Sequence, residues 1–114
     1  MEAVVGSRRR DEAAARLAAG VAGYALNTPT EGILAGPRGS AETAFARKVA
    51  MYLCHVAFEL SLGRVAAAFA RDRSTVAYAC HSIEDRREDE AFDAWIAALE
   101  RAVREAPAPG EWPS

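Results

Sequence analysis

The sequence contains little cysteine and no long hydrophobic segment. Its two cysteines, Cys54 and Cys80, each lie among apolar residues with helical spacing, where a reduced, buried thiol is expected. No run of about 18 apolar residues is present, so we predict no membrane-spanning segment. The first residues also lack the charged and then apolar pattern of a signal peptide. We therefore expect a cytoplasmic protein.

Residue patterns typical of catalysis, metal binding and nucleotide binding are also missing. Cys54-His55 and Cys80-His81 place cysteine beside histidine, but adjacent helical residues point about 100° apart, and neither pair has zinc-ligand spacing. No Ser/His/Asp set or carboxylate pair suggests an active site, and no Gly-x-x-x-x-Gly-Lys-Ser/Thr motif occurs. We expect no enzymatic activity and no metal, cofactor or nucleotide.

What the sequence does contain is alanine with helical periodicity. Its 114 residues suit one small domain, alanine favours helix, and no strand pattern occurs, so the predicted fold is all-α. We predict helices over residues 11–26, 40–59, 61–69, 72–87 and 89–105, the second capped by Ser40, the fourth by Asp72 or Ser74. The last should bury Phe92, Trp95, Ile96, Leu99 and Val103.

The predicted organisation has four parts. Residues 1–10 form a flexible arm, residues 11–39 a helix followed by a Gly- and Pro-rich loop, residues 40–105 the main domain, and residues 106–114 a disordered tail. Within the main domain the charges are uneven. Residues 38–83 hold six basic and three acidic side chains, and residues 84–105 hold four basic and eight acidic ones. Because phosphate attracts cations, we predict a DNA-facing side within residues 38–83.

Residues 61–83 have the spacing of a helix-turn-helix. This motif needs a small residue where its two helices cross, and apolar residues at the end of the first helix and at two places in the second. The residues that meet these requirements are Ala66, Phe69, Val76 and Ala79, with Ile83 extending the apolar face. Ala70 occupies the turn position where glycine is most common. We predict that the second helix enters the major groove of DNA.

The exposed face of this second helix suits contact with base edges. Its predicted members are Asp72, Arg73, Ser74, Ala77, Tyr78 and His81. Arginine reads guanine, small side chains contact thymine methyl groups, and hydroxyls bind phosphates or base edges. Arg64 is interpreted as a phosphate contact or as plain surface charge. Residues 8–10, three consecutive arginines, are interpreted as a solvated arm or as an arm against the DNA backbone.

Three segments resemble the C-terminal DNA-binding domain of the bacterial replication initiator DnaA. That family has an Arg-Gln-x-Ala-Met-x-Leu helix, a Ser-Leu-x-x-Ile-Gly-x-x-Phe helix, and the signature Asp-His-Thr-Thr-Val-x-x-Ala-x-x-x-Ile. The matching segments here are Arg-Lys-Val-Ala-Met-Tyr-Leu (47–53), Ser-Leu-Gly-Arg-Val-Ala-Ala-Ala-Phe (61–69) and Asp-Arg-Ser-Thr-Val-Ala-Tyr-Ala-Cys-His-Ser-Ile (72–83). The resemblance implies a trihelical helix-turn-helix core of the DnaA or Trp-repressor type, with one helix added at each side.

The resemblance also implies roles for single residues. Residues 72–75 occupy the family's base-reading signature, and Arg47 and Lys48 match its basic phosphate-contact region. Arg38 lies one residue before the position of its minor-groove arginine. The complete set of predicted DNA-binding residues is Arg38, Arg47, Lys48, Arg64, Arg71, Asp72, Arg73, Ser74, Thr75, Tyr78 and His81.

Three departures from the family pattern affect the predicted function. The turn between the two helices is one residue shorter, Arg73 replaces the signature histidine, and Ser74 replaces one threonine. The family's nucleotide-binding module is missing from these residues, so we expect a standalone relative instead of an initiator.

The expected function is sequence-specific binding of double-stranded DNA. We favour a nucleoid-associated transcription regulator, similar to activators of gene-transfer-agent or prophage-type clusters, with RNA polymerase or a sigma-like co-activator as its protein partner. The first alternative is a replication-control protein that competes with DnaA at its sites. The second is an interaction adaptor that keeps the fold without binding DNA, and the positive charge of residues 38–83 argues against it.

Overall fold

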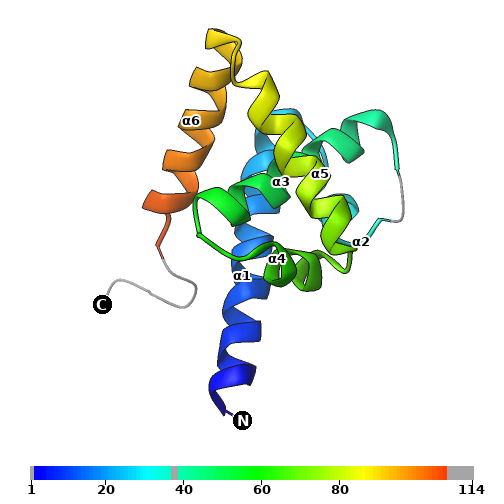
Figure 1. The fold of residues 1–114 in the computed structure, drawn as a ribbon, viewed down its shortest axis with the longest axis vertical. Coiled ribbons are helices and arrows are strands. Elements are labelled where there is room, and N and C mark those ends of the chain that lie inside the picture. The colour runs from blue at the N-terminus through cyan, green and yellow to red at the C-terminus, as the bar shows by residue number, and fades with distance from the viewer. Residues whose placement is uncertain (1, 37–38, 108–114) are drawn as a thin grey trace.

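The structure, a computed structural model, describes residues 2–36 and 39–107, and within them the chain is all-helical (Figure 1). The helices in chain order are α1 (Glu2–Leu26), α2 (Thr30–Ala35), α3 (Ala41–Val56), α4 (Leu62–Phe69), α5 (Arg73–Arg86) and α6 (Glu90–Glu105). The predicted trihelical core is confirmed as α3, α4 and α5. The flanking helices are α1 and α2 before it and α6 after it. None of the described helices has the length and apolar character needed to cross a membrane.

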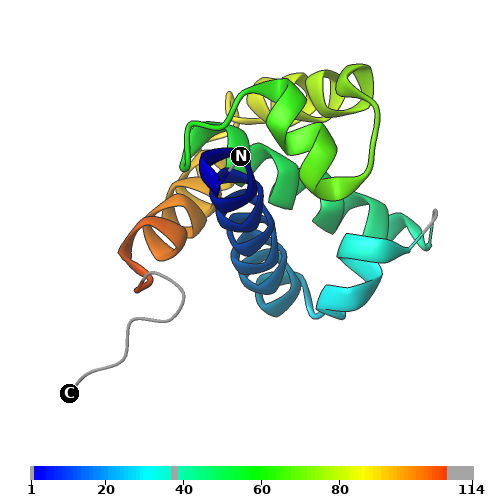
Figure 2. The same cartoon turned by 90° about the horizontal axis from the view of Figure 1, so that it is seen from below.

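Helix α3 occupies the centre of the fold, with α1 on one side and α5 on the other (Figure 2). The hydroxyl oxygen of Ser40 accepts from the backbone N–H of Thr43, which confirms the predicted N-cap. The helix ends at Val56, three residues before the predicted end. Glu59 adopts a left-handed conformation (φ 57°), and the Leu60 N–H closes the turn on the Cys54 carbonyl.

Helix α1 corrects the prediction of a flexible arm over residues 1–10, because the described part of this segment, from Glu2, is helical. The segment contains no proline, and its alanine, glutamate and arginine favour helix, so nothing forces a helix start at Asp11. On one face of α1 the side chains Ala15, Ala18, Ala19 and Ala22 are buried. Their small size lets α1 pack closely against α3.

Helix α2 lies within residues 29–39, for which the sequence predicted only a loop. Pro29 precedes it with the fixed φ that suits a helix start, and Ile33 is fully buried. The guanidinium of Arg47, on α3, donates from Nε to the Ile33 carbonyl at 2.9 Å and from Nη2 to the Gly32 and Gly36 carbonyls at 2.9 Å each. This six-residue helix therefore depends on a side chain distant in sequence, which local patterns do not reveal.

Helix α6 packs where the sequence predicted, with Asp89 as its N-cap and Ile96, Leu99 and Val103 buried. Phe92 and Trp95 are half-buried, and the centroid of each ring lies 6.4 Å from that of Phe45 and 5.7 Å from that of the other. The guanidinium of Arg87, just after α5, donates to the Tyr52 hydroxyl at 2.9 Å and to Glu100 at 3.1 Å. This network ties α6 to α3. The tail predicted to be disordered lies, from residue 108, outside the described residues.

Candidate nucleic-acid interface

The turn between α4 and α5 fixes the angle of the two helices. Ala70 is left-handed (φ 52°, ψ 48°), the conformation that favours glycine, and the Arg71 N–H bonds to the Ala66 carbonyl at 2.9 Å. The five apolar positions predicted to form the crossing are all buried: Ala66, Phe69, Val76, Ala79 and Ile83. The helix-turn-helix geometry thus follows from small and apolar residues at its crossing.

The N-terminal half of α5 presents polar side chains to solvent. The exposed members of the predicted set on this helix and its cap are Asp72, Arg73, Ser74, Thr75, Tyr78 and His81. Asp72 is the N-cap residue, but its carboxylate makes no capping hydrogen bond. Ala77, predicted to be exposed, is half-buried. The helix N-terminus adds a partial positive charge, so this face attracts an anion while Arg73 and the hydroxyls offer donors.

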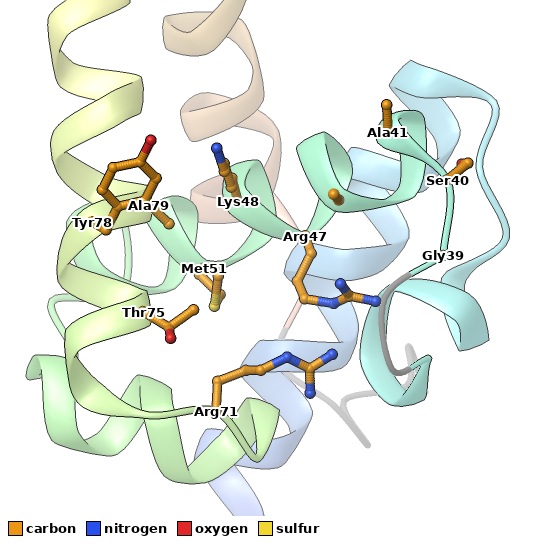
Figure 3. Close-up of a pocket in the computed structure, with 11 residues that line it drawn as sticks. Gly39, Ser40, Ala41, Arg47, Lys48, Met51, Arg71, Thr75, Tyr78 and Ala79 are labelled. Atoms are coloured by element: carbon orange, nitrogen blue, oxygen red, sulfur yellow. The ribbon is translucent and has the colours of Figure 1, made fainter.

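A groove of about 420 Å³ runs beside this face, between the start of α3 and α5 (Figure 3). It is lined by Gly39, Ser40, Ala41, Ala44, Arg47, Lys48, Met51, Arg71, Thr75, Tyr78 and Ala79. The ionisable lining residues other than Tyr78 are all cations, which makes the groove electropositive. Gly39 and Ser40 line the groove but were not among the predicted DNA-binding residues; the predicted N-cap role of Ser40 was the local signal for their position beside α3.

Lys48 and Tyr78 meet at the rim of the groove. The Lys48 ammonium lies 5.0 Å from the centre of the Tyr78 ring, within range of a cation–π interaction. Tyr78 itself is 67% exposed. The contact orients Lys48 beside α5, at the edge of the face that carries Arg73 and Thr75, where its charge remains available to a phosphate.

Arg71 joins the turn to the segment after α2. Its guanidinium donates to the Phe69 and Ala70 carbonyls at 3.0 and 3.3 Å and to the Gly36 carbonyl at 2.6 Å. It is half-buried and also lines the groove. Arg71 therefore holds the turn in place and contributes positive charge to the groove.

Arg47 does not have the exposure expected of the predicted phosphate contact. Its side chain is buried, with the whole residue 6% exposed, and three of its hydrogen bonds go to carbonyls at the end of α2. Burial, and then the nearby Arg71 charge, lower the pKa of Arg47. The role that these contacts give Arg47 is to attach α2 to α3.

Arg64 is also engaged within the protein. Its Nε and Nη2 atoms donate to the two carboxylate oxygens of Asp11 at 2.9 and 2.7 Å, a bidentate pair that raises the pKa of Arg64. This pair connects α4 to α1, across 53 positions of sequence. The sequence offered a phosphate contact or plain surface charge for Arg64, and neither interpretation included an ion pair with Asp11. Arg38 lies outside the described residues.

Acidic side chains mark the limit of the interface at the C-terminal end of α5. His81 lies 3.7 Å from Asp85, and Glu84, Asp85, Glu88 and Asp89 are exposed around the turn to α6. Negative charge there repels phosphate, so along α5 the anion-attracting surface is limited to the first half of the helix and the adjacent groove.

The two cysteines have no ligand-like arrangement. Burial raises the pKa of Cys54 to about 12 and that of Cys80 to about 11, so both are protonated thiols near neutral pH. Across the described part of the chain, no group of three or more His, Cys, Asp or Glu side chains is arranged to hold a metal ion.

Comparison with known proteins gives two matches. The family described as "Bacterial dnaA protein helix-turn-helix" matches residues 25–83, a range that contains α2 to α4 and most of α5. A crystal structure of a DNA replication initiation factor superimposes with a TM-score of 0.79 at 28% sequence identity. The similarity covers 91% of this chain and 32% of that protein, so this chain corresponds to about a third of its length.

Proposed function

Because this chain belongs to the family of bacterial DnaA helix-turn-helix domains, which matches more than half of its residues, we propose that it is a sequence-specific DNA-binding protein that regulates transcription. Binding of double-stranded DNA follows from the family, and regulation of transcription is proposed in addition. The observation that carries the proposal is the exposed first half of α5 beside a groove lined by Arg71 and Lys48.

In the proposed complex, α5 enters the major groove with its N-terminus foremost. Arg73 donates to a guanine edge, and Ser74 and Thr75 contact neighbouring bases or phosphates. Lys48 and Arg71 bind the phosphates of one strand, which sets the position of the protein without reading sequence. The protein is proposed to act as a binder, without catalytic chemistry.

Selection from a random DNA library tests the sequence-reading role of α5. The Arg73→Ala variant should lose preference at one or two base pairs, because a bidentate arginine–guanine contact contributes about 1–3 kcal/mol of discrimination. The matched control is Lys48→Ala, which should weaken binding to all sequences about equally. Equal site preferences for the wild type and Arg73→Ala would contradict the proposal that Arg73 reads a base.

The regulatory role rests on the family resemblance and on the differences at the start of α5. Arg73 and Ser74 differ from the DnaA signature, which supports a target site other than the DnaA box. Genes of gene-transfer-agent or prophage type are the proposed targets, with RNA polymerase or a sigma-like co-activator as the partner.

A second candidate is control of replication by competition at DnaA sites. The similarity to a DNA replication initiation factor favours it. Genome-wide mapping of bound sites separates the two roles, because occupancy concentrated at promoters supports transcription and occupancy concentrated at the origin supports replication control. Recovery of the DnaA box in the selection, unchanged in an Arg73→His variant, would place replication control first.

A further inference from the structure

Helix α1 has a second apolar face that no other described helix fully covers. One face is buried through Ala15, Ala18, Ala19 and Ala22. The other carries Ala13, Ala14, Leu17, Gly20, Val21, Tyr24 and Ala25, at the three- and four-residue spacing of a helix side. Leu17 and Val21 are half-buried, and Tyr24 is 93% exposed. A helix that is apolar on more than one side normally has a partner on each.

Two adjoining pockets lie along this second face, with residues of α6 on their other side, and together they are called the α1–α6 groove. One part, of about 530 Å³, is lined by Ala13, Ala14, Leu17, Phe58, Val103, Ala106 and Pro107, together with Arg9, Arg10 and Arg104. The adjoining part, of about 500 Å³, shares Leu17 and is lined by Arg16, Gly20, Val21, Tyr24, Ala25, Leu99 and Ala102. From Arg9 to Ala25 the α1 wall is about 24 Å long at the helical rise per residue.

The charged side chains that line the groove are all basic within the described residues. Besides Tyr24, the ionisable lining residues there are Arg9, Arg10, Arg16 and Arg104, and the first two belong to the segment interpreted above as a solvated arm or as an arm against the DNA backbone. Arg9 and Arg104 are exposed, and Arg16 forms a surface ion pair with Glu31 at 3.3 Å. An occupant with apolar side chains flanked by carboxylates therefore matches both the walls and the rim.

The groove is separate from the proposed DNA-binding face. No lining residue belongs to α4 or α5. In Figure 2 α6 lies toward the lower left and α1 runs through the centre, whereas α4 and α5 lie in the upper part of the view. An occupant of the groove consequently leaves the first half of α5 accessible to DNA.

We propose that the α1–α6 groove binds an acidic amphipathic helix of a partner protein. Two helices that leave a long apolar groove between them accept a third helix whose apolar residues recur at intervals of three and four. Small residues on the walls, such as Ala14, Gly20 and Ala102, allow that helix to approach closely. This inference goes beyond DNA binding and does not depend on it.

Titration of the full chain with two synthetic helices tests the proposal. Both probes are amphipathic peptides of about 18 residues with the same leucine face, one flanked by glutamate and the other by lysine. We expect the acidic peptide to bind at least tenfold more tightly. Backbone amide signals from residues 13–25 and 99–106 should shift, and saturating duplex DNA should leave the peptide affinity unchanged.

A charge-reversed variant provides the matched comparison. Arg9→Glu combined with Arg104→Glu should weaken binding of the acidic peptide at least tenfold and strengthen binding of the basic one. Arg101→Glu, an exposed α6 change outside the groove lining, should leave both affinities unchanged. Since these are exposed positions, the folded state should persist, which the amide spectrum of each variant verifies.

Several results would overturn the proposal. Equal binding of both peptides, binding of neither, or amide shifts confined to α5 would show that the groove does not recognise an acidic helix. Binding seen only after deletion of residues 108–114 would assign the groove to this chain's own C-terminal segment, and a dimer held through α1 would assign it to a second copy. In each case intact DNA binding would leave the proposed function standing.

Discussion

At the scale of single residues, the Gly36 carbonyl shows how the protein uses its cations. It accepts from Nη2 of Arg47 at 2.9 Å and from Nη2 of Arg71 at 2.6 Å, so two guanidinium groups meet at one oxygen. Their mutual repulsion contributes to the lowered pKa of Arg47. The carbonyls at the end of α2 offset that repulsion because the helix terminus is partially negative. Positive charge is thereby held at the base of the groove beside α5.

Replacement of Arg47 should therefore affect stability more than DNA recognition. Arg47→Ala removes three hydrogen bonds from a charged donor and leaves the Gly36 carbonyl with its bond from Arg71; such bonds contribute about 1.5–3 kcal/mol each without adding fully. We expect a loss of about 3 kcal/mol in the free energy of unfolding, measured by urea denaturation. Arg101→Ala, on the surface of α6, serves as the control and should change it by less than about 0.5 kcal/mol. A stable Arg47→Ala variant with weak DNA binding would instead support a phosphate contact.

At the scale of elements, the turn between α4 and α5 determines where the recognition helix begins. Phe69 is buried at the end of α4 and Val76 in the first turns of α5, and the left-handed Ala70 between them reverses the chain direction. The turn is one residue shorter than in the DnaA pattern, and Ala70 stands where glycine is most common. Alanine in a left-handed conformation is strained by its Cβ atom.

Replacement of Ala70 by glycine should stabilise the protein. Ala70 is exposed, so Ala70→Gly removes strain without removing packing, and the gain is limited by the greater freedom of glycine in the unfolded chain. We expect an increase of about 0.5–1 kcal/mol in the free energy of unfolding, measured by thermal or urea denaturation.

A matched helix position gives the opposite sign. Ala67→Gly, exposed within α4, should lose about 1 kcal/mol because glycine is a poor helix former. Equal losses of stability in the two glycine variants would contradict the left-handed conformation of Ala70.

The packing of the same two helices can be tested through Phe69, which is 1% exposed. Phe69→Ala should lower the free energy of unfolding by roughly 3–5 kcal/mol, because it removes a buried ring and leaves a cavity at the crossing. Calorimetric unfolding measures the change. A variant within about 1 kcal/mol of wild type would mean that the crossing lies elsewhere.

At the scale of the whole molecule, charge is separated between faces. Lys48, Arg71 and Arg73 gather around the first half of α5, and exposed acidic residues follow near the α5–α6 turn. Two arginines predicted to bind phosphate instead link helices, Arg47 to α2 and Arg64 to α1. The DNA-facing charge is thus smaller than the sequence alone suggests.

This smaller charge gives a measurable salt dependence. Each neutralised phosphate contributes about −0.9 to the slope of log affinity against log salt, so the two cations proposed to bind phosphate, Lys48 and Arg71, predict a slope of about −2. The sequence predicts about four to six phosphate contacts and a slope of roughly −4 to −5, with contacts from Arg38, Arg47, Lys48, Arg64 and Arg71. Titration of one duplex across salt concentrations distinguishes the two predictions, and a slope near −5 would mean that additional cations bind phosphate, including Arg47 and Arg64 released from their internal partners.

The sequence by itself determined the helices and their caps where the signals are local. Ser40, Ser61 and Asp89 accept from backbone N–H groups three residues ahead, and the apolar spacing from Ala66 to Ile83 specifies the crossing of α4 and α5. The exposed face of α5 follows from the same periodicity, so the base-reading candidates were identifiable before the fold was known.

Tertiary structure alone decided what the arginines bind and where short or marginal elements form. Helix α2 exists because Arg47 reaches its carbonyls from α3, and Arg64 pairs with Asp11 because packing brings α1 beside α4. A guanidinium on a long side chain donates to whichever oxygen lies in reach, and its identity in the sequence does not select between phosphate, carboxylate and carbonyl. That selection depends on distances set by residues far apart in the chain.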